Sequence, residues 1–247
     1  MPRNFDPAKP ELMDRTREVT PAFERDMQNL VSINRQFGGH RLVRRYLEGW
    51  MNSGRVYRVL DLCTGVADIP RMMVNWARSR DITLRVDAVD ANPAVLSIGR
   101  RDCASYPEIQ LHESDVLSFT PDDRYDLVHC SLALHHFGDD DSIRLLRNAR
   151  KWSNRWVLIA DLERSPLTTA AIWLVTGLLY RDLMTAHDGR LSAQRAFSFR
   201  EFRHLAKEAG WHNFGHVRSM WCRQVLWRDE QTLGEVPIDP VSLPIPA

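Results

Sequence analysis

The amino-acid sequence predicts an α/β protein built on a doubly wound, largely parallel sheet. Between residues 56 and 162, short β-rich runs alternate with stretches of helical periodicity, the pattern of successive β–α–β units. Two of the runs, VLDL at 59–62 and WVLIADL at 156–162, are almost continuously apolar, as expected of strands that helices cover on both faces. With 247 residues the chain is long enough for a single domain with a sizeable core.

Seven strands and, apart from a helical insert after the fifth strand, four helices are expected from residue 56 onward. The strands are predicted at residues 56–63, 82–90, 109–114, 125–132, 155–162, 214–220 and 223–229. The helices are predicted near residues 68–79, 93–105, 140–151 and 199–209. Gly210 is expected to end the last helix.

The predicted core spans residues 56–229, and it is accompanied by an N-terminal helical cap, a helical insert and a C-terminal tail. Residues 11–52 form a predicted N-terminal helical cap, because apolar side chains recur there at helical spacing. After the fifth strand a helical insert is expected at about 165–190; its apolar helix either covers a substrate cavity, belongs to the core or forms the face of a homodimer. A polar loop is predicted at 186–198, and the proline-rich residues 230–247 are expected to form a loose tail.

Composition excludes several functional classes. The chain has 33 Lys+Arg and 32 Asp+Glu, so its net charge of +1 provides no basic surface for a nucleic acid. Its four cysteines are far apart, which argues against a disulfide framework and against a zinc site built on cysteine; we assign no metal ligands. The N-terminus has no secretory signal, and the longest apolar stretch is shorter than the ~20 residues of a membrane span. A cytoplasmic protein without a membrane span is expected.

A turn of small residues follows the first predicted strand, in the segment Asp61-Leu62-Cys63-Thr64-Gly65. Small side chains let the backbone turn sharply and approach a ligand beyond the carboxyl ends of the strands. Residues 56–162 resemble the class I S-adenosylmethionine (SAM)-dependent methyltransferases, whose first loop commonly reads VLDLGCGTGD. The resemblance implies a Rossmann-like seven-stranded sheet, SAM as cofactor with S-adenosylhomocysteine (SAH) as product, and a cofactor-binding role for Asp61, Cys63, Thr64 and Gly65.

This first loop departs from the family pattern at two glycine positions, which are Cys63 and Ala67 here. A Cβ atom at residue 67 destabilises the loop if that residue needs a positive φ. More narrowly, the segments 161–167, 186–199 and 210–216 are similar to a subgroup associated with type III polyketide synthases. That similarity implies a phenolic acceptor.

Further cofactor contacts are expected at the ends of the second and third strands. Asp90 is placed to accept hydrogen bonds from the ribose hydroxyls, or alternatively to cap the next helix. The resemblance implies that Ala91 and Asn92 border the adenine. It also implies that Asp115 binds the adenine amino group and that Val116 packs on the ring.

The fourth and fifth strands end in residues suited to the chemistry of transfer. The resemblance places Ser131 and the following LALHHF segment beside the methylsulfonium group and the acceptor. His135 and His136 are candidate general bases, with structural hydrogen bonding as the alternative. Asp161 is a candidate to orient the acceptor or a histidine, and His187 a candidate for a His–Asp pair at the mouth of the site; an ordinary salt bridge is the alternative for Asp161.

The SAM carboxylate needs a cationic partner, and Arg41 or Arg35 in the helical cap is a candidate for it, with an ordinary solvated helix arginine as the alternative. The sequence therefore favours a methyltransferase acting on an apolar small molecule, with the hydroxyl of a phenolic or polyketide-derived compound as acceptor. One alternative is a degenerate SAM-binding accessory protein, because two glycines of the first loop are replaced. A nicotinamide-dependent oxidoreductase is disfavoured because the loop lacks the G-x-G-x-x-G pattern.

Overall fold

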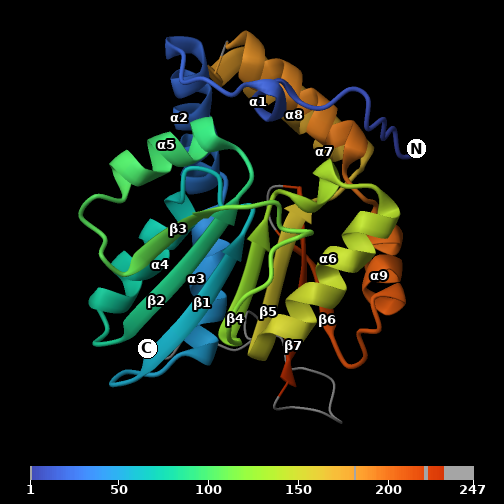
Figure 1. Ribbon diagram of the computed structural model, residues 1–247. Helices are drawn as coiled ribbons and strands as arrows, with labels where there is room; N and C mark the ends of the chain where they lie inside the picture. Colours follow the sequence, from blue (N-terminus) through green and yellow to red (C-terminus); the bar gives the residue numbers. More distant parts are fainter. Residues whose placement is uncertain (1, 181, 220–221, 231–247) are drawn as a thin grey trace, which may run out of the picture.

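The computed structural model describes residues 2–180, 182–219 and 222–230, and their strands form one seven-stranded sheet (Figure 1). The strands are β1 (Val56–Leu62), β2 (Thr83–Asp90), β3 (Ile109–Glu113), β4 (Tyr125–Ser131), β5 (Ser153–Leu162), β6 (Gly215–Ser219) and β7 (Arg223–Asp229). Their order is β3-β2-β1-β4-β5-β7-β6, and only β7 runs antiparallel to its neighbours. The predicted doubly wound sheet is confirmed. Apart from Glu230, the predicted tail lies outside the described residues.

Helices cover both faces of the sheet. One face packs against α3 (Gly39–Trp50) and α4 (Asp68–Arg78), and the other against α6 (Asp139–Trp152) and α9 (Phe199–Glu208). Strand β1 illustrates why both faces are apolar, since Tyr57 and Val59 enter the first core and Leu60 and Leu62 enter the second. The loops at the carboxyl ends of the strands are therefore held between two packed layers.

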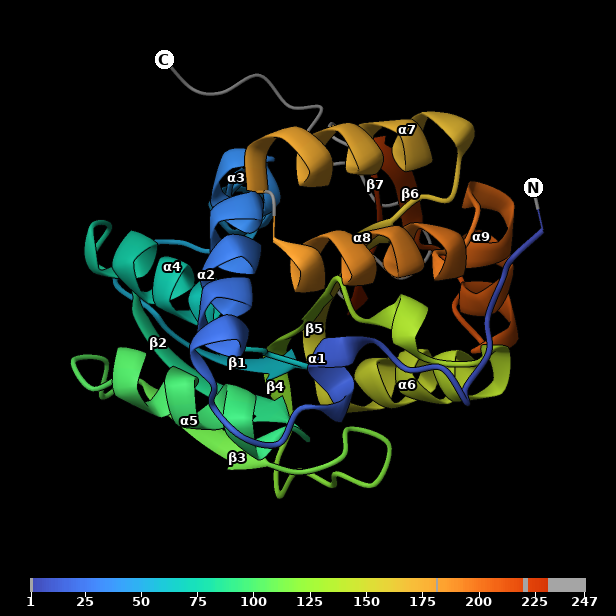
Figure 2. The ribbon, with the colours of Figure 1, turned by 90° about the horizontal axis from the view of Figure 1, so that it is seen from above.

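Four helices gather above the carboxyl ends of the parallel strands (Figures 1 and 2). They are α1 (Leu12–Arg15), α2 (Pro21–Gln36), α7 (Pro166–Val175) and α8 (Leu183–Arg195), and α5 (Pro93–Asp102) packs under α2. The helical cap is interrupted at Gly38, which has a φ of 80°, and α3 starts directly after it.

The predicted polar loop at 186–198 is wrong, because α8 occupies most of it. Three polar side chains of this helix, Asp188, Ser192 and Arg195, are buried against the N-terminal segment. The carboxylate of Asp188 accepts hydrogen bonds from the backbone N–H groups of Leu12 and Met13, each at 2.9 Å, and thereby caps α1. Polar composition indicated a solvated loop, but these polar groups are satisfied inside the protein by a segment far away in the sequence.

The predicted apolar insert forms α7, a π-helical turn (Thr176–Tyr180) and α8. Its outer side exposes large apolar side chains: Leu167, Trp173, Leu174, Leu178 and Leu183. A homodimer through this surface stays a prediction. In the part of the chain that the structure describes, no helix combines the length and apolar character needed to cross a bilayer.

Candidate functional site

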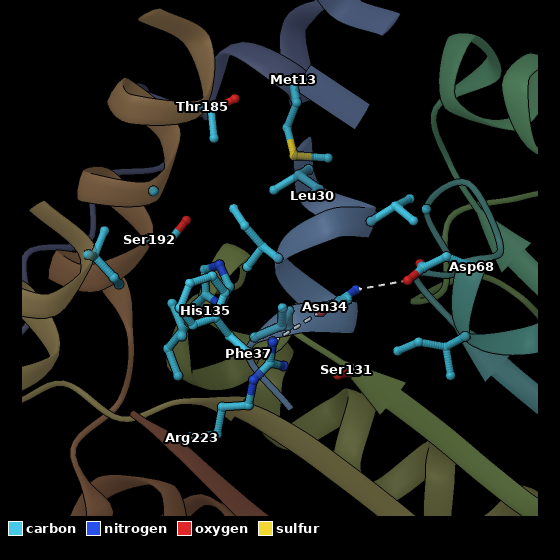
Figure 3. A pocket seen from close by; sticks show the side chains of 18 of the residues that line it. Met13, Leu30, Asn34, Phe37, Asp68, Ser131, His135, Thr185, Ser192 and Arg223 are labelled. Carbon is cyan, nitrogen blue, oxygen red and sulfur yellow. Dashed lines mark hydrogen bonds between the residues drawn. The ribbon is translucent and has the colours of Figure 1, made fainter. Parts of the chain in front are cut away.

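A cavity of about 350 Å³ lies between the first loop, the ends of β4 and β5, and the helices above them (Figure 3). This volume falls in the range of small-molecule sites. Among the residues proposed from the sequence, the lining includes Asp61, Cys63, Thr64, Gly65, Ser131, His135 and His136. The cavity thus brings the first loop and the two adjacent histidines together.

The first loop has the sharp left-handed turns that its small residues permit. Cys63, Gly65 and Ala67 have φ values of 54°, 59° and 57°. The expected strain at Ala67 is therefore present, at about 1–2 kcal/mol for a non-glycine residue in this conformation. A Cβ atom built on Gly65 meets nothing within 4 Å, so open space adjoins the loop at this position. The loop keeps room for a ligand despite its two replaced glycines.

A buried polar pair lies beneath the loop. The Asp61 carboxylate accepts a hydrogen bond from the Thr64 hydroxyl at 2.6 Å and lies 2.5 Å from Nδ1 of His129. His129 lines the cavity, is fully buried, and its Nε2 has no hydrogen-bond partner among the described residues. We did not predict His129 from the sequence; a histidine inside the apolar strand YDLVHC was the available signal, because buried polar groups need partners.

The carboxylate of Asp90 holds the first loop from the side of β2. It accepts hydrogen bonds from the backbone N–H groups of Gly65 and Asn92, both at 2.9 Å. Burial raises the pKa of Asp90, although these two bonds lower it in part. The helix cap here is Asn92, whose side chain accepts from the Ala94 N–H and also donates to the backbone oxygen of Met13. The N-terminal segment therefore crosses this edge of the sheet, as Figure 2 also shows.

The remaining predicted adenine contacts lie outside the cavity lining. Ala91 and Asp115 are exposed, and the Asp115 carboxylate accepts the backbone N–H of Leu117 in a local turn. Val116 is buried in the core beside the sheet. The adenine-binding roles of these residues stay predictions.

His135 and Asp161 form a buried pair at the ends of β4 and β5. The His135 Nδ1 lies 2.6 Å from the Asp161 carboxylate, whose second oxygen accepts the His135 backbone N–H at 2.9 Å. Burial opposes ionisation of Asp161, but the neighbouring His135 and these hydrogen bonds keep its pKa below the ordinary value. Because Nδ1 is held by the carboxylate, Nε2 is the ring atom available to a ligand in the cavity.

The ring of His136 lies between two carboxylates of the N-terminal segment. Its Nδ1 lies 2.9 Å from the Asp14 carboxylate, and its Nε2 lies 3.7 Å from that of Glu11. Burial alone lowers the pKa of His136, but Glu11 and Asp14 outweigh it and raise the pKa to about 10. In this arrangement His136 carries a proton at neutral pH, and His135 is the better candidate for a base.

Arg223, at the start of β7, is a cationic group that we did not predict from the sequence. Its side chain is buried and lines the cavity, and its Nη2 donates to the Asn34 side chain at 3.1 Å (Figure 3). Its Nη1 is buried without a hydrogen-bond partner in the described part of the chain. Burial lowers the pKa of Arg223 to about 10, so the group is charged at neutral pH. Arg41, the predicted partner for a carboxylate, is exposed on α3 and does not line the cavity.

The predicted His–Asp pair on α8 forms, but not at the cavity. His187 Nδ1 lies 2.8 Å from the Asp188 carboxylate, and half of the His187 side chain is exposed. Neither residue lines the cavity. A catalytic role of His187 stays a prediction without a place at this cavity.

Comparison with known proteins agrees with this architecture. The sequence family described as "Methyltransferase domain" matches residues 59–155, which hold β1 to the start of β5. A 2-phytyl-1,4-naphtoquinone methyltransferase of Synechococcus elongatus is 30% identical over 135 residues, 53% of this chain. The chain spans 58% of that relative's length.

Solved structures of methyltransferases share the fold at low sequence identity. A magnesium protoporphyrin IX methyltransferase from Synechocystis with bound SAH has a TM-score of 0.55 and 13% identity, over 86% of this chain and 88% of that one. A plantazolicin methyltransferase in complex with SAH and a substrate analogue has a TM-score of 0.62 and 11% identity, over 85% and 91%. The chain therefore has the fold of these methyltransferase structures.

Proposed function

We propose that this protein is a SAM-dependent methyltransferase that transfers a methyl group to a small apolar acceptor, and that the acceptor atom is a phenolic or polyketide-derived hydroxyl. The observation that carries the proposal is one cavity lined on one side by the left-handed first loop and on another by His135, whose ring is held by the buried Asp161. The match of residues 59–155 to a methyltransferase domain supports it.

The residues of the first loop fit SAM. Open space adjoins Gly65 where a ligand approaches the backbone closely. The Asp90 oxygens each accept one backbone N–H, and a carboxylate oxygen has a second lone pair for a ribose hydroxyl. The free Nη1 of Arg223 is the cationic donor that the carboxylate of SAM requires. When bound, SAM supplies an electrophilic methyl group.

The opposite side of the cavity suits an apolar ring. Its walls include Met27 and Leu30 of α2 and Ile172 and Val175 of α7. The relative named for a phytylated naphthoquinone and the fold neighbour named for a protoporphyrin support an acceptor of this kind. An acceptor hydroxyl that enters this space meets the Nε2 side of His135.

His135 is the residue we assign to the hydroxyl proton. Transfer to oxygen requires that the hydroxyl be oriented and lose its proton, which a positioned histidine accomplishes. Asp161 holds the ring by two hydrogen bonds and stabilises the imidazolium that forms. This is a hypothesis about catalysis: His135→Gln should retain SAH binding and lose most of the turnover.

The cofactor part is tested by calorimetric titration with SAM, SAH and NAD. Micromolar binding of the adenosyl ligands without binding of NAD is expected. Gly65→Ala should weaken that binding, whereas the matched variant Gly54→Ala should not, because both glycines have a positive φ and open surroundings but only Gly65 lines the cavity. Equal effects of the two variants, or no binding by the unmodified protein, would contradict the proposal.

The transfer part is tested by incubating the protein with SAM and a panel of alkylated phenols and hydroquinones. Mass spectrometry should detect a methyl ether and SAH in equal amounts. SAH binding without transfer to any acceptor would favour the accessory protein that the altered first loop suggested.

A further inference from the structure

Three side chains with metal-binding atoms converge on one wall of the cavity. They are Glu11 from the N-terminal segment, and His135 and His136 from the loop after β4. The Nε2 atoms of the two histidines lie 3.9 Å and 3.7 Å from the two oxygens of the Glu11 carboxylate. One ligand atom from each residue lies within 4.8 Å of the other two.

These separations are too long for hydrogen bonds and close to those of metal ligands. Hydrogen bonds between nitrogen and oxygen measure about 2.7–3.2 Å. Ligand atoms at about 2.0–2.1 Å from a tetrahedral zinc ion lie about 3.3 Å apart. A small contraction of the cluster therefore brings all three side chains into coordination distance.

The far side of each imidazole is already fixed by a carboxylate. The Nδ1 of His135 lies 2.6 Å from Asp161, and that of His136 lies 2.9 Å from Asp14. This carboxylate–histidine arrangement orients the imidazoles in protein metal sites and leaves Nε2 to the metal. The Ser192 hydroxyl, which donates to Glu11 at 2.8 Å, holds the third ligand in the same way.

The charge of the cluster also favours a cation. Glu11, Asp14 and Asp161 bring three carboxylates around two imidazoles, and Glu11 and Asp161 are almost completely buried. Buried carboxylates need a compensating charge. A divalent cation bound between the imidazoles and Glu11 would supply this charge.

We infer that Glu11, His135 and His136 bind one divalent transition-metal ion, with Zn²⁺ as the ion this donor set matches. Two histidines and one glutamate make a three-ligand zinc site with an open fourth position. All three residues line the cavity, so the open position faces the space assigned to the acceptor.

The role of the ion, though not its binding, rests on the proposed function. An acceptor hydroxyl oxygen at the open position would lose its proton more easily, because a bound divalent ion lowers the pKa of a coordinated hydroxyl or water. The lone pair of His135 then serves the metal, and the released proton passes to solvent. Sequence spacing did not indicate the site, since Glu11 is far from the histidines along the chain.

The test is calorimetric titration of the metal-free full chain with zinc chloride. One ion per chain is expected. Glu11→Gln and His136→Gln should each weaken binding by at least the ~10–100-fold that loss of an outer-sphere partner costs, and Asp14→Asn by about that amount. The matched control is His112→Gln, which removes a partly exposed histidine that also pairs with an aspartate and does not line the cavity, and this variant should bind zinc as the unmodified protein does.

Cobalt distinguishes this site from binding by cysteine, because Cys63 and Cys222 line the same cavity. The Co²⁺-loaded protein should show d–d absorption without a thiolate-to-cobalt charge-transfer band. A charge-transfer band, the absence of stoichiometric zinc binding, or unchanged affinity in both Glu11→Gln and His136→Gln would overturn the inference.

SAH titration of the same samples separates this inference from the proposed function. Variants that bind SAH normally are folded, so their lost zinc affinity is attributable to the site. Zinc binding by a protein that binds no adenosyl ligand would leave the metal site standing while the methyltransferase proposal fails. SAH binding without zinc binding would overturn the metal site and leave the methyltransferase proposal standing.

Discussion

The two walls of the cavity are built in different ways. The wall at the first loop combines short-range bonds, such as Thr64 to Asp61, with bonds between the ends of adjacent strands, such as the Gly65 N–H to Asp90. The opposite wall depends on bonds between segments far apart in the chain, such as Arg223 to Asn34 and Thr185 to Asp26. Short-range bonds are recognisable as sequence motifs, whereas long-range bonds are not.

The long-range wall also holds buried charge with unsatisfied atoms. Nη1 of Arg223 and Oδ2 of Asp26 have no hydrogen-bond partner among the described residues. Burying such groups opposes folding and is acceptable where a ligand supplies the missing partner. The following variants test whether each wall has the role assigned to it.

The largest effect is expected for Asp90→Ala, which removes the carboxylate that holds the first loop at Gly65. Loss of two charge-assisted hydrogen bonds to the ribose, each worth about 1.5 kcal/mol, should weaken SAH binding about 100-fold. Calorimetry checks the affinity, and the unfolding temperature reports whether the loop held by Asp90 is disturbed. Affinity within threefold of the unmodified protein would remove Asp90 from the cofactor site.

A somewhat smaller effect is expected for Arg223→Met on the opposite wall. Losing one buried cation–carboxylate contact should weaken SAH binding by about 2 kcal/mol, roughly 30-fold. Arg41→Met is the matched control, because Arg41 is the exposed arginine that the sequence favoured. Calorimetry that finds the reverse order of effects would restore the sequence-based assignment.

Asp26→Asn should stabilise the protein in a pH-dependent way. Burial, helped by the nearby Asp188 and Asp182, raises the pKa of Asp26 from 3.8 to about 6 against the lowering effect of the Thr185 hydrogen bond. The folded state therefore keeps a proton that the unfolded state has lost, and stability falls as the pH rises from about 4 to about 6. Urea unfolding should find the gain from Asp26→Asn about 1 kcal/mol larger at pH 8 than at pH 5. A gain independent of pH would show that Asp26 does not titrate in this range.

The smallest effect is expected for Ala67→Gly in the first loop. Glycine relieves about 1 kcal/mol of left-handed strain but loses a buried methyl group worth about 0.8 kcal/mol, and it adds freedom to the unfolded chain. The free energy of unfolding should change by less than about 1 kcal/mol, and SAH affinity should stay the same. A large gain in SAH affinity would mean that alanine at position 67, where the family pattern has glycine, impairs the site.

Most of the sheet and its covering helices were predictable because their periodicity is local. Each predicted strand forms near its expected bounds, since apolar runs and turn residues mark strands along the chain itself. The polar part of helix α8, which was predicted as a loop, was missed because its partners lie far away in the sequence. Its buried polar residues, such as Asp188, are satisfied by the N-terminal segment, and no local pattern records that pairing.

The residues of the candidate site also fall into two groups: those that local sequence motifs predicted and those that only the folded chain brings together. Sequence motifs led to the first loop, Asp90 and the two adjacent histidines, because their places follow from the ends of parallel strands meeting at one edge of the sheet. Only the folded chain brings Arg223 and Glu11 to that edge, since one arrives on an antiparallel strand and the other on a segment tied down by α8. Local periodicity and turn residues predict the strands, the helices between them and the turns. Which distant side chains meet depends instead on how the whole chain packs.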